Sequence, residues 1–253
     1  MPFPRPTVVW YLFVKSSAVQ RRRAALTVAA IAWGSLSLLL MLSFGQGLRD
    51  SMWRASQGQG SNLAVNWPGR TSLVWNGLPA GRPVRLKIDD VAVLRERIPE
   101  LAAVTGEIHR WGTSLEGDET RTAKINGVMP VYGMMRNQIP RPGGRFLTEL
   151  DDAGRRRVVF LGDSLARGLF GTEDCVGRTV RIERVPYTVV GVMVDKVVMG
   201  NYGGMDTDQA VIPIRTYEAQ FGRDRLSVLL LKPHRGPDTG LVVQRAKEVL
   251  SPK

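Results

Sequence analysis

The longest unbroken apolar stretch of the chain covers residues 24–44 and contains no ionisable side chain. At 1.5 Å per residue, a helix of this length reaches about 32 Å, which matches a bilayer core of about 30 Å. Lipid offers no partner for open backbone N–H and C=O groups, so an α-helix is the form expected there. The pattern therefore predicts one transmembrane helix near the N-terminus.

The helical pattern continues beyond this span, because Leu48, Met52 and Ala55 recur at helical spacing. Gly58 and Gly60 follow, and glycine commonly ends a helix. We therefore expect the helix to continue as a stalk to about residue 58. A rigid helix that joins a membrane to an outer domain transmits movement, which a flexible linker does not.

Residues 1–23 form a short basic leader with five cationic side chains and no acidic one. Val9, Trp10, Phe13 and Val14 recur at helical spacing. The pattern predicts an amphipathic helix in the cytoplasmic membrane interface, with Trp10 and Tyr11 at the level of the lipid headgroups. A frayed tail is the alternative.

Arg21, Arg22 and Arg23 stand directly before the apolar run. The positive-inside bias places the N-terminus in the cytoplasm and the rest of the chain outside a cell membrane, either inner or plasma membrane. The competing interpretation is a cleaved signal peptide. The apolar run is longer than the core of such a peptide, and no small-x-small cleavage site follows Phe44, so an uncleaved anchor is favoured.

From residue 59 onward the pattern changes to short alternating or buried-type runs separated by Gly and Pro. Strands are predicted at residues 62–67, 104–110, 120–128, 157–161, 178–183, 187–194, 209–214 and 226–232, and helices at 89–98, 163–170 and 238–250. Residues 184–186 are expected to form the turn of a hairpin. Strands outnumber helices and the two are mixed along the chain, which indicates an extracytoplasmic α+β domain over residues 59–253.

Charge and cysteine content narrow the function classes. The 253 residues carry a net charge of +12, of which the leader contributes +5, so the remainder still carries 12 − 5 = +7. A domain with this net positive charge can bind anionic lipid or an acidic partner, or the charge can simply keep the domain soluble. The cations are scattered, which argues against nucleic acid. Cys175 is the only cysteine, so no internal disulfide forms, and a small buried hydrophobe is expected there.

The segment 162–165, Gly-Asp-Ser-Leu, follows a predicted strand and resembles the first block of GDSL-type esterases, in which the serine is the nucleophile. Those enzymes also carry an Asp-x-x-His pair. The only histidines, His109 and His234, both lack an aspartate three residues earlier. We favour Asp163 as a helix N-cap over Ser164 as a nucleophile, and a membrane-anchored esterase remains the alternative function.

Cofactor and metal motifs are weak. Residues 171–179 differ from a phosphate-binding loop in spacing, and Arg178 stands where that motif needs lysine. Two isolated histidines and one cysteine give no zinc-binding set. Asp206 and Asp208 are close enough in sequence to touch a cation, although two such carboxylates on one loop are usually only solvated. We expect no cofactor, no metal and no catalytic residue.

Four segments in one order carry a resemblance to a known family: residues 144–146 (GRF) followed by acidic residues, 158–171 (VVFLGDSLARGLFG), 176–192 (VGRTVRIERVPYTVVGV) and 210–213 (AVIP). Together with residues 21–48, they resemble the MacB/FtsX-like ABC transporter permeases, which carry a MacB-like periplasmic core domain. The positions that match its motifs, and for which a structural role is expected, are Gly144, Arg145, Phe146, Gly162, Phe170, Gly171, Gly177, Gly191 and Pro213.

The resemblance implies a non-enzymatic permease that couples ATP hydrolysis on a cytoplasmic ATPase subunit to motion of its outer domain, usually as a dimer with a second permease copy. It also implies two lobes: a membrane-proximal lobe over about 59–139 and 191–253, and an inserted small lobe over about 140–190. Family members have three further spans, which we expect on a missing C-terminal part or on a separate chain. A single-span scaffold or binding module is a further alternative.

Overall fold

A computed structural model of the protein describes residues 7, 10–11, 21–57, 62–72, 74, 77, 79–195 and 203–250, and the side chains of residues 50–57 lie outside this description. The chain divides into two compact units, residues 1–53 and residues 54–253. Their boundary falls inside one long helix.

That helix, α2, runs without interruption over Arg21–Gln57. Ala, Leu and Met, which favour helix, fill much of it. The transmembrane segment predicted for residues 24–44 is helical throughout, and the helix extends through the predicted stalk to Gln57. The expected terminators Gly58 and Gly60 lie outside the described residues. In the leader, residues 7, 10 and 11 are helical. The rest of the predicted amphipathic leader lies outside the described residues.

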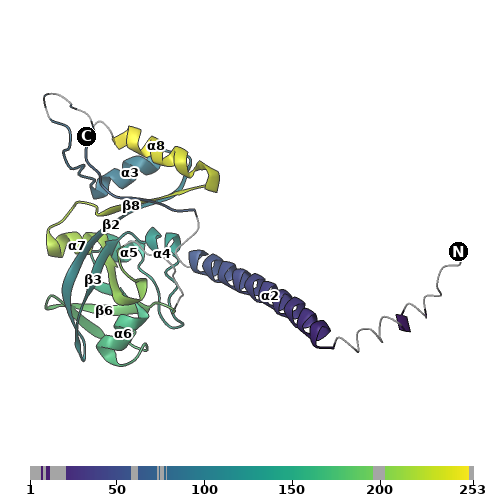
Figure 1. The fold of residues 1–253 in the computed structure, drawn as a ribbon. Helices are drawn as coiled ribbons and strands as arrows, with labels where there is room; N and C mark the ends of the chain where they lie inside the picture. The colour runs from purple at the N-terminus through teal and green to yellow at the C-terminus, as the bar shows by residue number, and fades with distance from the viewer. Residues whose placement is uncertain are drawn as a thin grey trace. The chain divides into compact units, whose positions relative to one another are not determined.

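The outer unit contains one eight-stranded sheet with a few covering helices, which confirms the α+β class (Figure 1). Its strands, in chain order, are β1 (Ala64–Asn66), β2 (Leu101–Glu116), β3 (Thr120–Val128), β4 (Val158–Leu161), β5 (Thr179–Ile182), β6 (Val185–Val192), β7 (Gln209–Pro213) and β8 (Val228–Pro233). Their order across the sheet is β1-β8-β2-β3-β7-β4-β6-β5. β3 and β7 are parallel, as are β4 and β6, so the sheet is mixed.

Strand β2 closes part of this sheet into a ring. Its first half pairs with β8, and its second half pairs with β3 on one side and with β5 at Leu115 and Glu116 on the other. The register shifts between Arg110 and Thr113, where Gly112 has φ +70°. Such a bulge bends a strand, and here it lets one strand of 16 residues serve both the open part and the ring β2-β3-β7-β4-β6-β5.

The helices of the outer unit are short. They are α3 (Ile88–Arg97), α4 (Val131–Met135), α5 (Glu149–Ala153), α6 (Asp163–Phe170), α7 (Ile214–Phe221) and α8 (Thr239–Leu250), with single 3₁₀ turns at Asp206–Asp208 (η1) and Gly236–Asp238 (η2). α3 packs on β2 and on α8, which covers β8, whereas α7 packs on β3 and β7 (Figure 1).

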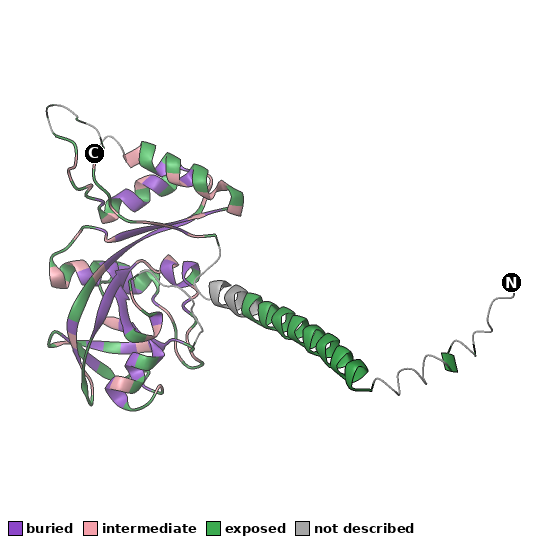
Figure 2. Ribbon diagram, in the orientation of Figure 1, coloured by how far each residue is buried: buried purple, intermediate pink, exposed green. Residues whose placement is uncertain are grey.

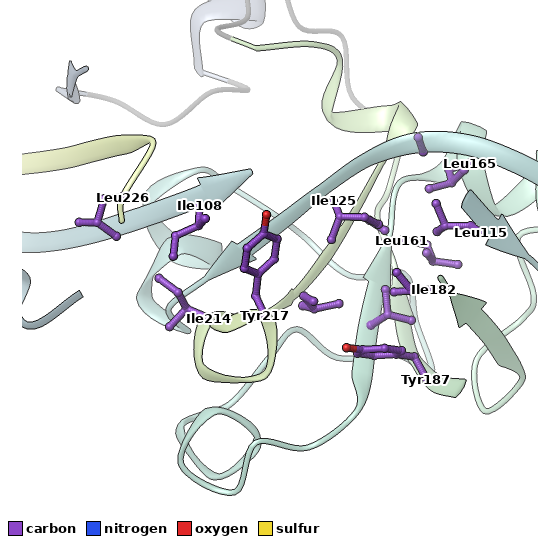
Figure 3. Packing of buried hydrophobic residues seen from close by; sticks show 14 of the residues in the cluster. Ile108, Leu115, Ile125, Leu161, Leu165, Ile182, Tyr187, Ile214, Tyr217 and Leu226 are labelled. Atoms are coloured by element: carbon purple, nitrogen blue, oxygen red, sulfur yellow. The ribbon is translucent and has the colours of Figure 1, made fainter. Parts of the chain in front are cut away.

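Two hydrophobic cores lie against the sheet. The larger includes Ile108, Ile125, Leu161 and Tyr187, which converge from four strands (Figure 3). The smaller core contains residues from the other face of the same strands, such as Phe160, whose neighbours Val159 and Leu161 belong to the larger core. Consecutive residues 123–128 of β3 are all buried, because both faces of that strand are covered.

Several predicted elements match closely, and their ends differ for local reasons. α6 spans the predicted residues, but its N-cap is Gly162 rather than Asp163. The hairpin turn between β5 and β6 consists of Glu183 and Arg184, not residues 184–186. Both turn residues have positive φ, 49° and 69°, as a two-residue type I′ turn requires.

The sequence patterns missed three helices, α4, α5 and α7. The strand predicted over residues 209–214 ends at Pro213, which is the N-cap of α7. The inserted lobe predicted over 140–190 stays a prediction. It would contain β4, β5 and all but the last two residues of β6, and these strands complete the ring with strands from outside that range.

Candidate functional site

The first functional feature is the uncovered apolar surface of α2. Residues 21–49 are exposed throughout, with exposed fractions of 72% at Trp33 and 74% at Phe44 (Figure 2). Among the described residues, α2 is the one helix long and apolar enough to cross a membrane. A helix with apolar side chains on all sides needs an apolar environment, which a lipid bilayer provides. Arg21, Arg22 and Arg23 form its first turn, and Trp10 and Tyr11 are exposed in the leader.

The second feature is built from the motif residues Gly144, Arg145 and Phe146. Arg145 reaches Asp151 with two hydrogen bonds, Nη1–Oδ2 at 2.6 Å and Nη2–Oδ1 at 3.1 Å. Asp151 also accepts from the backbone N–H and the hydroxyl of Thr148, the N-cap of α5. Arg145 therefore fixes the loop that precedes α5 to the start of that helix.

The charge of Asp151 is held in place by these donors. Its side chain is fully buried, and burial alone raises the pKa of a carboxyl group. The hydrogen bonds from Arg145 and Thr148 and the charge of Arg145 outweigh burial, so the pKa of Asp151 lies below its ordinary value. The pair is consequently an ionised, structural link rather than a proton-transfer site.

Glycines at two of the motif positions allow backbone to meet backbone. The N–H of Arg145 donates to the carbonyl oxygen of Val190 at 2.9 Å, which brings this loop against β6. A Cβ atom at Gly191 would lie 2.4 Å from the Arg145 carbonyl oxygen, and one at Gly144 would lie 2.9 Å from the Gly191 Cα atom. The loop approaches β6 at this distance only because both residues lack a side chain.

The aromatic motif residue Phe146 closes the same region. Its ring meets Phe160 edge-on, with centroids 4.9 Å apart and planes at 72°. A Cβ atom at Gly133 of α4 would overlap the Phe146 ring. Phe146 thus joins α4, the loop and β4 in the smaller core.

The remaining motif residues serve turns and element ends. Gly171 is the C-cap of α6 with φ +68°, and Gly177 has φ +85°. A Cβ atom at Gly162 would lie 2.3 Å from the carbonyl oxygen of a residue in η1. Phe170 is buried beneath Arg178, whose Cζ atom is 4.4 Å from the ring centroid. Pro213 is buried where β7 passes into α7.

The structure places Ser164 away from the groups that ester hydrolysis requires. It is exposed on α6, and no hydrogen bond joins it to a histidine within the described part of the chain. His109 lies beside Glu107 in β2, and the backbone of His234 bonds to Glu100. Asp163 pairs with Arg167 one turn along α6, at 2.7 Å.

Cys175 is buried as expected, whereas Asp206, which was expected to be solvated, is only 4% exposed. Cys175 is buried, and burial raises the pKa of its thiol to about 11. Asp206 accepts hydrogen bonds from Arg136, Gln138 and Gln209 at 3.0–3.1 Å, so its carboxylate is engaged by three side chains. Burial raises the pKa of Asp208. The described residues contain no group of three His, Cys, Asp or Glu side chains placed to hold a metal ion.

Sequence reasoning also missed a buried ion pair that joins β2 and β3. Lys124 and Glu107 are 4% and 0% exposed, and they form an ion pair at 3.0 Å. Burial raises the pKa of Glu107, but His109 and the Lys124 charge outweigh it and hold that pKa below its ordinary value. The ammonium of Lys124 also lies 5.5 Å from the Trp111 ring centroid. A charged residue inside an otherwise apolar strand pattern was the available signal.

Known proteins with similar sequences and structures share this architecture. The profile of the family described as the MacB-like periplasmic core domain matches residues 24–249. The chain is 27% identical over 236 residues to the macrolide export ATP-binding/permease protein MacB of Bdellovibrio bacteriovorus, covering 92% of this chain and 36% of that protein. It is 31% identical over 204 residues to the protein of that name from Chlorobaculum tepidum, covering 80% and 31%. The chain thus spans about a third of the length of these curated relatives.

Solved structures show a similar fold. The periplasmic region of MacB from Actinobacillus actinomycetemcomitans aligns with a TM-score of 0.60 at 21% identity, covering 77% of this chain and 87% of that one. The extracellular domain of the noncanonic ABC-type transporter YknZ from Gram-positive bacteria aligns with a TM-score of 0.60 at 16% identity, covering 74% and 94%. With the profile match over residues 24–249, these findings show that the chain belongs to the MacB-like periplasmic core domain family.

Proposed function

We propose that this chain is the N-terminal part of an ABC transporter permease, which couples cytoplasmic ATP hydrolysis to movement of an extracytoplasmic domain. One observation carries the proposal. An uncovered apolar helix, Arg21–Gln57, is followed along the chain by a domain of the MacB-like periplasmic core family. Similarity to relatives named ATP-binding/permease proteins supports the transporter class.

The proposed topology has the N-terminus in the cytoplasm and residues 59–253 outside the cell membrane. Arg21, Arg22 and Arg23 support this orientation, because positive charge next to a span is retained on the cytoplasmic side. Trp10 and Tyr11 would lie at the lipid headgroups. The lobe division, with an insert over about 140–190 in a membrane-proximal lobe over 59–139 and 191–253, belongs to the same proposal.

The proposed partners are a cytoplasmic ABC ATPase subunit, a second permease copy and the remaining transmembrane spans. We propose that ATP is hydrolysed by this ATPase subunit, because the relatives that the chain resembles are named ATP-binding/permease proteins. The outer domain is proposed to be non-enzymatic, since its motif residues are engaged in packing, turns and the Arg145–Asp151 pair. Export, lipoprotein handling and cell-envelope work are the classes of task that this role covers.

Recovery of the complex from native membranes tests the proposal. A tag on the C-terminus of the chain, followed by mild detergent extraction and affinity capture, is expected to recover an ATPase subunit in stoichiometric amount. Capture in a buffer that dissociates subunits gives the background. If native membranes never yield an ATPase subunit, the chain is a single-span scaffold or binding module instead.

Insertion of residues next to Ser51, within α2, tests the coupling role of the helix. Seven glycines are expected to leave the chain in the membrane but to abolish ATP-driven transport by the assembled complex, because glycine breaks helix continuity. Seven alanines form the control, since they add about two helical turns and change the phase by only about 20°. Full transport in the glycine variant would show that α2 only anchors the domain to the membrane and does not transmit movement.

A further inference from the structure

A cavity of about 620 Å³ lies on the outer domain, in a region that the motif residues do not touch. It is lined by residues 82–85 and by Thr71, Lys87 and Asp90. Three of the lining side chains are cations, and Asp90 supplies the lone carboxylate among these described residues. Asp90 is 2% exposed, and its Oδ2 accepts the backbone N–H of Lys87 at 2.9 Å. Cations therefore outnumber carboxylates in the described lining of the cavity.

The backbone places two of these cations, Arg85 and Lys87, in a row with Arg225 of a neighbouring segment. Residues 85–87 alternate, with Leu86 buried and Arg85 and Lys87 exposed on either side of it. Lys87 pairs with Arg225 in an antiparallel bridge, and the N–H of Leu226 donates to the Leu86 carbonyl oxygen at 2.9 Å. Residues opposite each other in such a bridge project to the same side, so Arg225 extends the row beside Lys87.

This row lacks matching negative charge. Asp224 lies 3.8 Å from Lys87, and both side chains are about half exposed. Within the described residues, neither Arg85 nor Arg225 has a carboxylate in ion-pair distance. Lys87 and Arg225 carry like charges and stand opposite each other in the bridge, so they repel. An anion bound between them would relieve this repulsion.

We propose that this surface docks an extended, acidic peptide segment of an extracytoplasmic partner protein. Arg85 and Lys87 are two residues apart on extended backbone, which separates them by about 6.6 Å, the spacing of alternate carboxylates along an extended acidic peptide. Guanidinium groups bind carboxylates in a fork geometry. Val84 and Pro83 give the cavity an apolar wall for intervening side chains. The inference goes beyond the proposed transporter role and does not depend on the ATPase.

Peptide binding to the full chain in detergent micelles tests this site. The probe is fluorescein-labelled hexaglutamate, with labelled hexaglutamine as the uncharged control, and fluorescence anisotropy gives Kd. Hexaglutamate is expected to bind and hexaglutamine not to bind. Raising NaCl from about 50 mM to about 500 mM is expected to weaken binding at least tenfold, because exposed charges are screened.

A matched pair of double variants locates the site. Arg85→Ala with Arg225→Ala is expected to raise Kd about tenfold or more. Arg181→Ala with Arg235→Ala removes the same charge from exposed positions elsewhere and is expected to leave Kd unchanged. Near-UV circular dichroism checks that both variants keep the fold, and Arg85→Lys with Arg225→Lys is expected to restore most of the affinity.

Three results would overturn the proposal. They are equal loss of affinity in both double variants, no hexaglutamate binding up to about 1 mM, and displacement of the bound peptide by phosphatidylglycerol, but not by phosphatidylcholine, added to the micelles. The last result would assign the surface to anionic lipid. Failure of ATPase capture would leave this binding result unaffected, so the two proposals fail separately.

Discussion

Replacement of Gly191 by alanine tests whether the motif glycines serve close backbone contact. The new methyl group would lie 2.4 Å from the Arg145 carbonyl oxygen and 3.0 Å from its nitrogen, where ordinary contacts begin at 3.4 Å. Both groups belong to the backbone, so no side-chain rotation relieves the overlap. Overpacking of this kind costs about 1–3 kcal/mol. Loss of the Arg145 N–H···O=C Val190 hydrogen bond adds about 1 kcal/mol.

The expected destabilisation is therefore about 2–4 kcal/mol, which for a domain of this size lowers Tm by roughly 4–16 °C. Thermal unfolding of the full chain in detergent, followed by circular dichroism, measures it. Gly240→Ala is the control, because a Cβ atom there has nothing within 4 Å and alanine favours the helix α8. Equal Tm values for the two variants would refute the argument from backbone contact.

Two further predictions concern ionisation and topology. The depressed pKa of Asp151 stabilises the fold above the unfolded pKa of about 3.9, and this contribution disappears as pH falls through the folded value. Urea midpoints should therefore differ between wild type and Asp151→Asn at pH 7, and the difference should shrink below about pH 4; a constant difference contradicts the ion pair. A membrane-impermeant maleimide should label Ser164→Cys in intact spheroplasts but not wild type, because Cys175 is buried with a thiol pKa of about 11. Labelling only after lysis would place the domain in the cytoplasm.

Local patterns predicted the elements whose ends are decided within a few residues. α6 matched because Leu165, Ala166 and Leu169 form a buried helical stripe and Gly171 adopts the left-handed C-cap. The hairpin turn was displaced because Val185 continues the alternation of β6, which leaves Glu183 and Arg184 for the turn.

Strand order could not be predicted from these patterns. β3 and β7 pair in parallel, with Lys124 opposite Gln209, although 85 positions separate them in sequence. Such pairing depends on how distant segments pack together, which periodicity does not record. The same limit applies to the Glu107–Lys124 pair, because each residue alone reads as a polar interruption of a strand.

The motif residues came from a family resemblance, and their physical roles became clear only in three dimensions. Gly144 lies against Gly191, which is 191 − 144 = 47 positions further along the chain, and Gly162 lies against Thr207 of η1, which is 207 − 162 = 45 positions further. Nothing in the local sequence predicts these contacts, since a glycine next to a strand fits a turn equally well.

These contacts bear on how the domain can perform the coupling role proposed above. A domain that passes movement from one partner to another must resist deformation itself, because force that bends it is not transmitted. The Gly144–Gly191 contact and the Arg145–Asp151 pair fasten one loop to a strand and to a helix. Substitutions at this junction should therefore weaken coupling before they weaken membrane anchoring. If the proposed coupling role holds, Gly191→Ala lowers transport by the complex while ATP hydrolysis continues, whereas equal loss of transport and hydrolysis would indicate a defect in assembly.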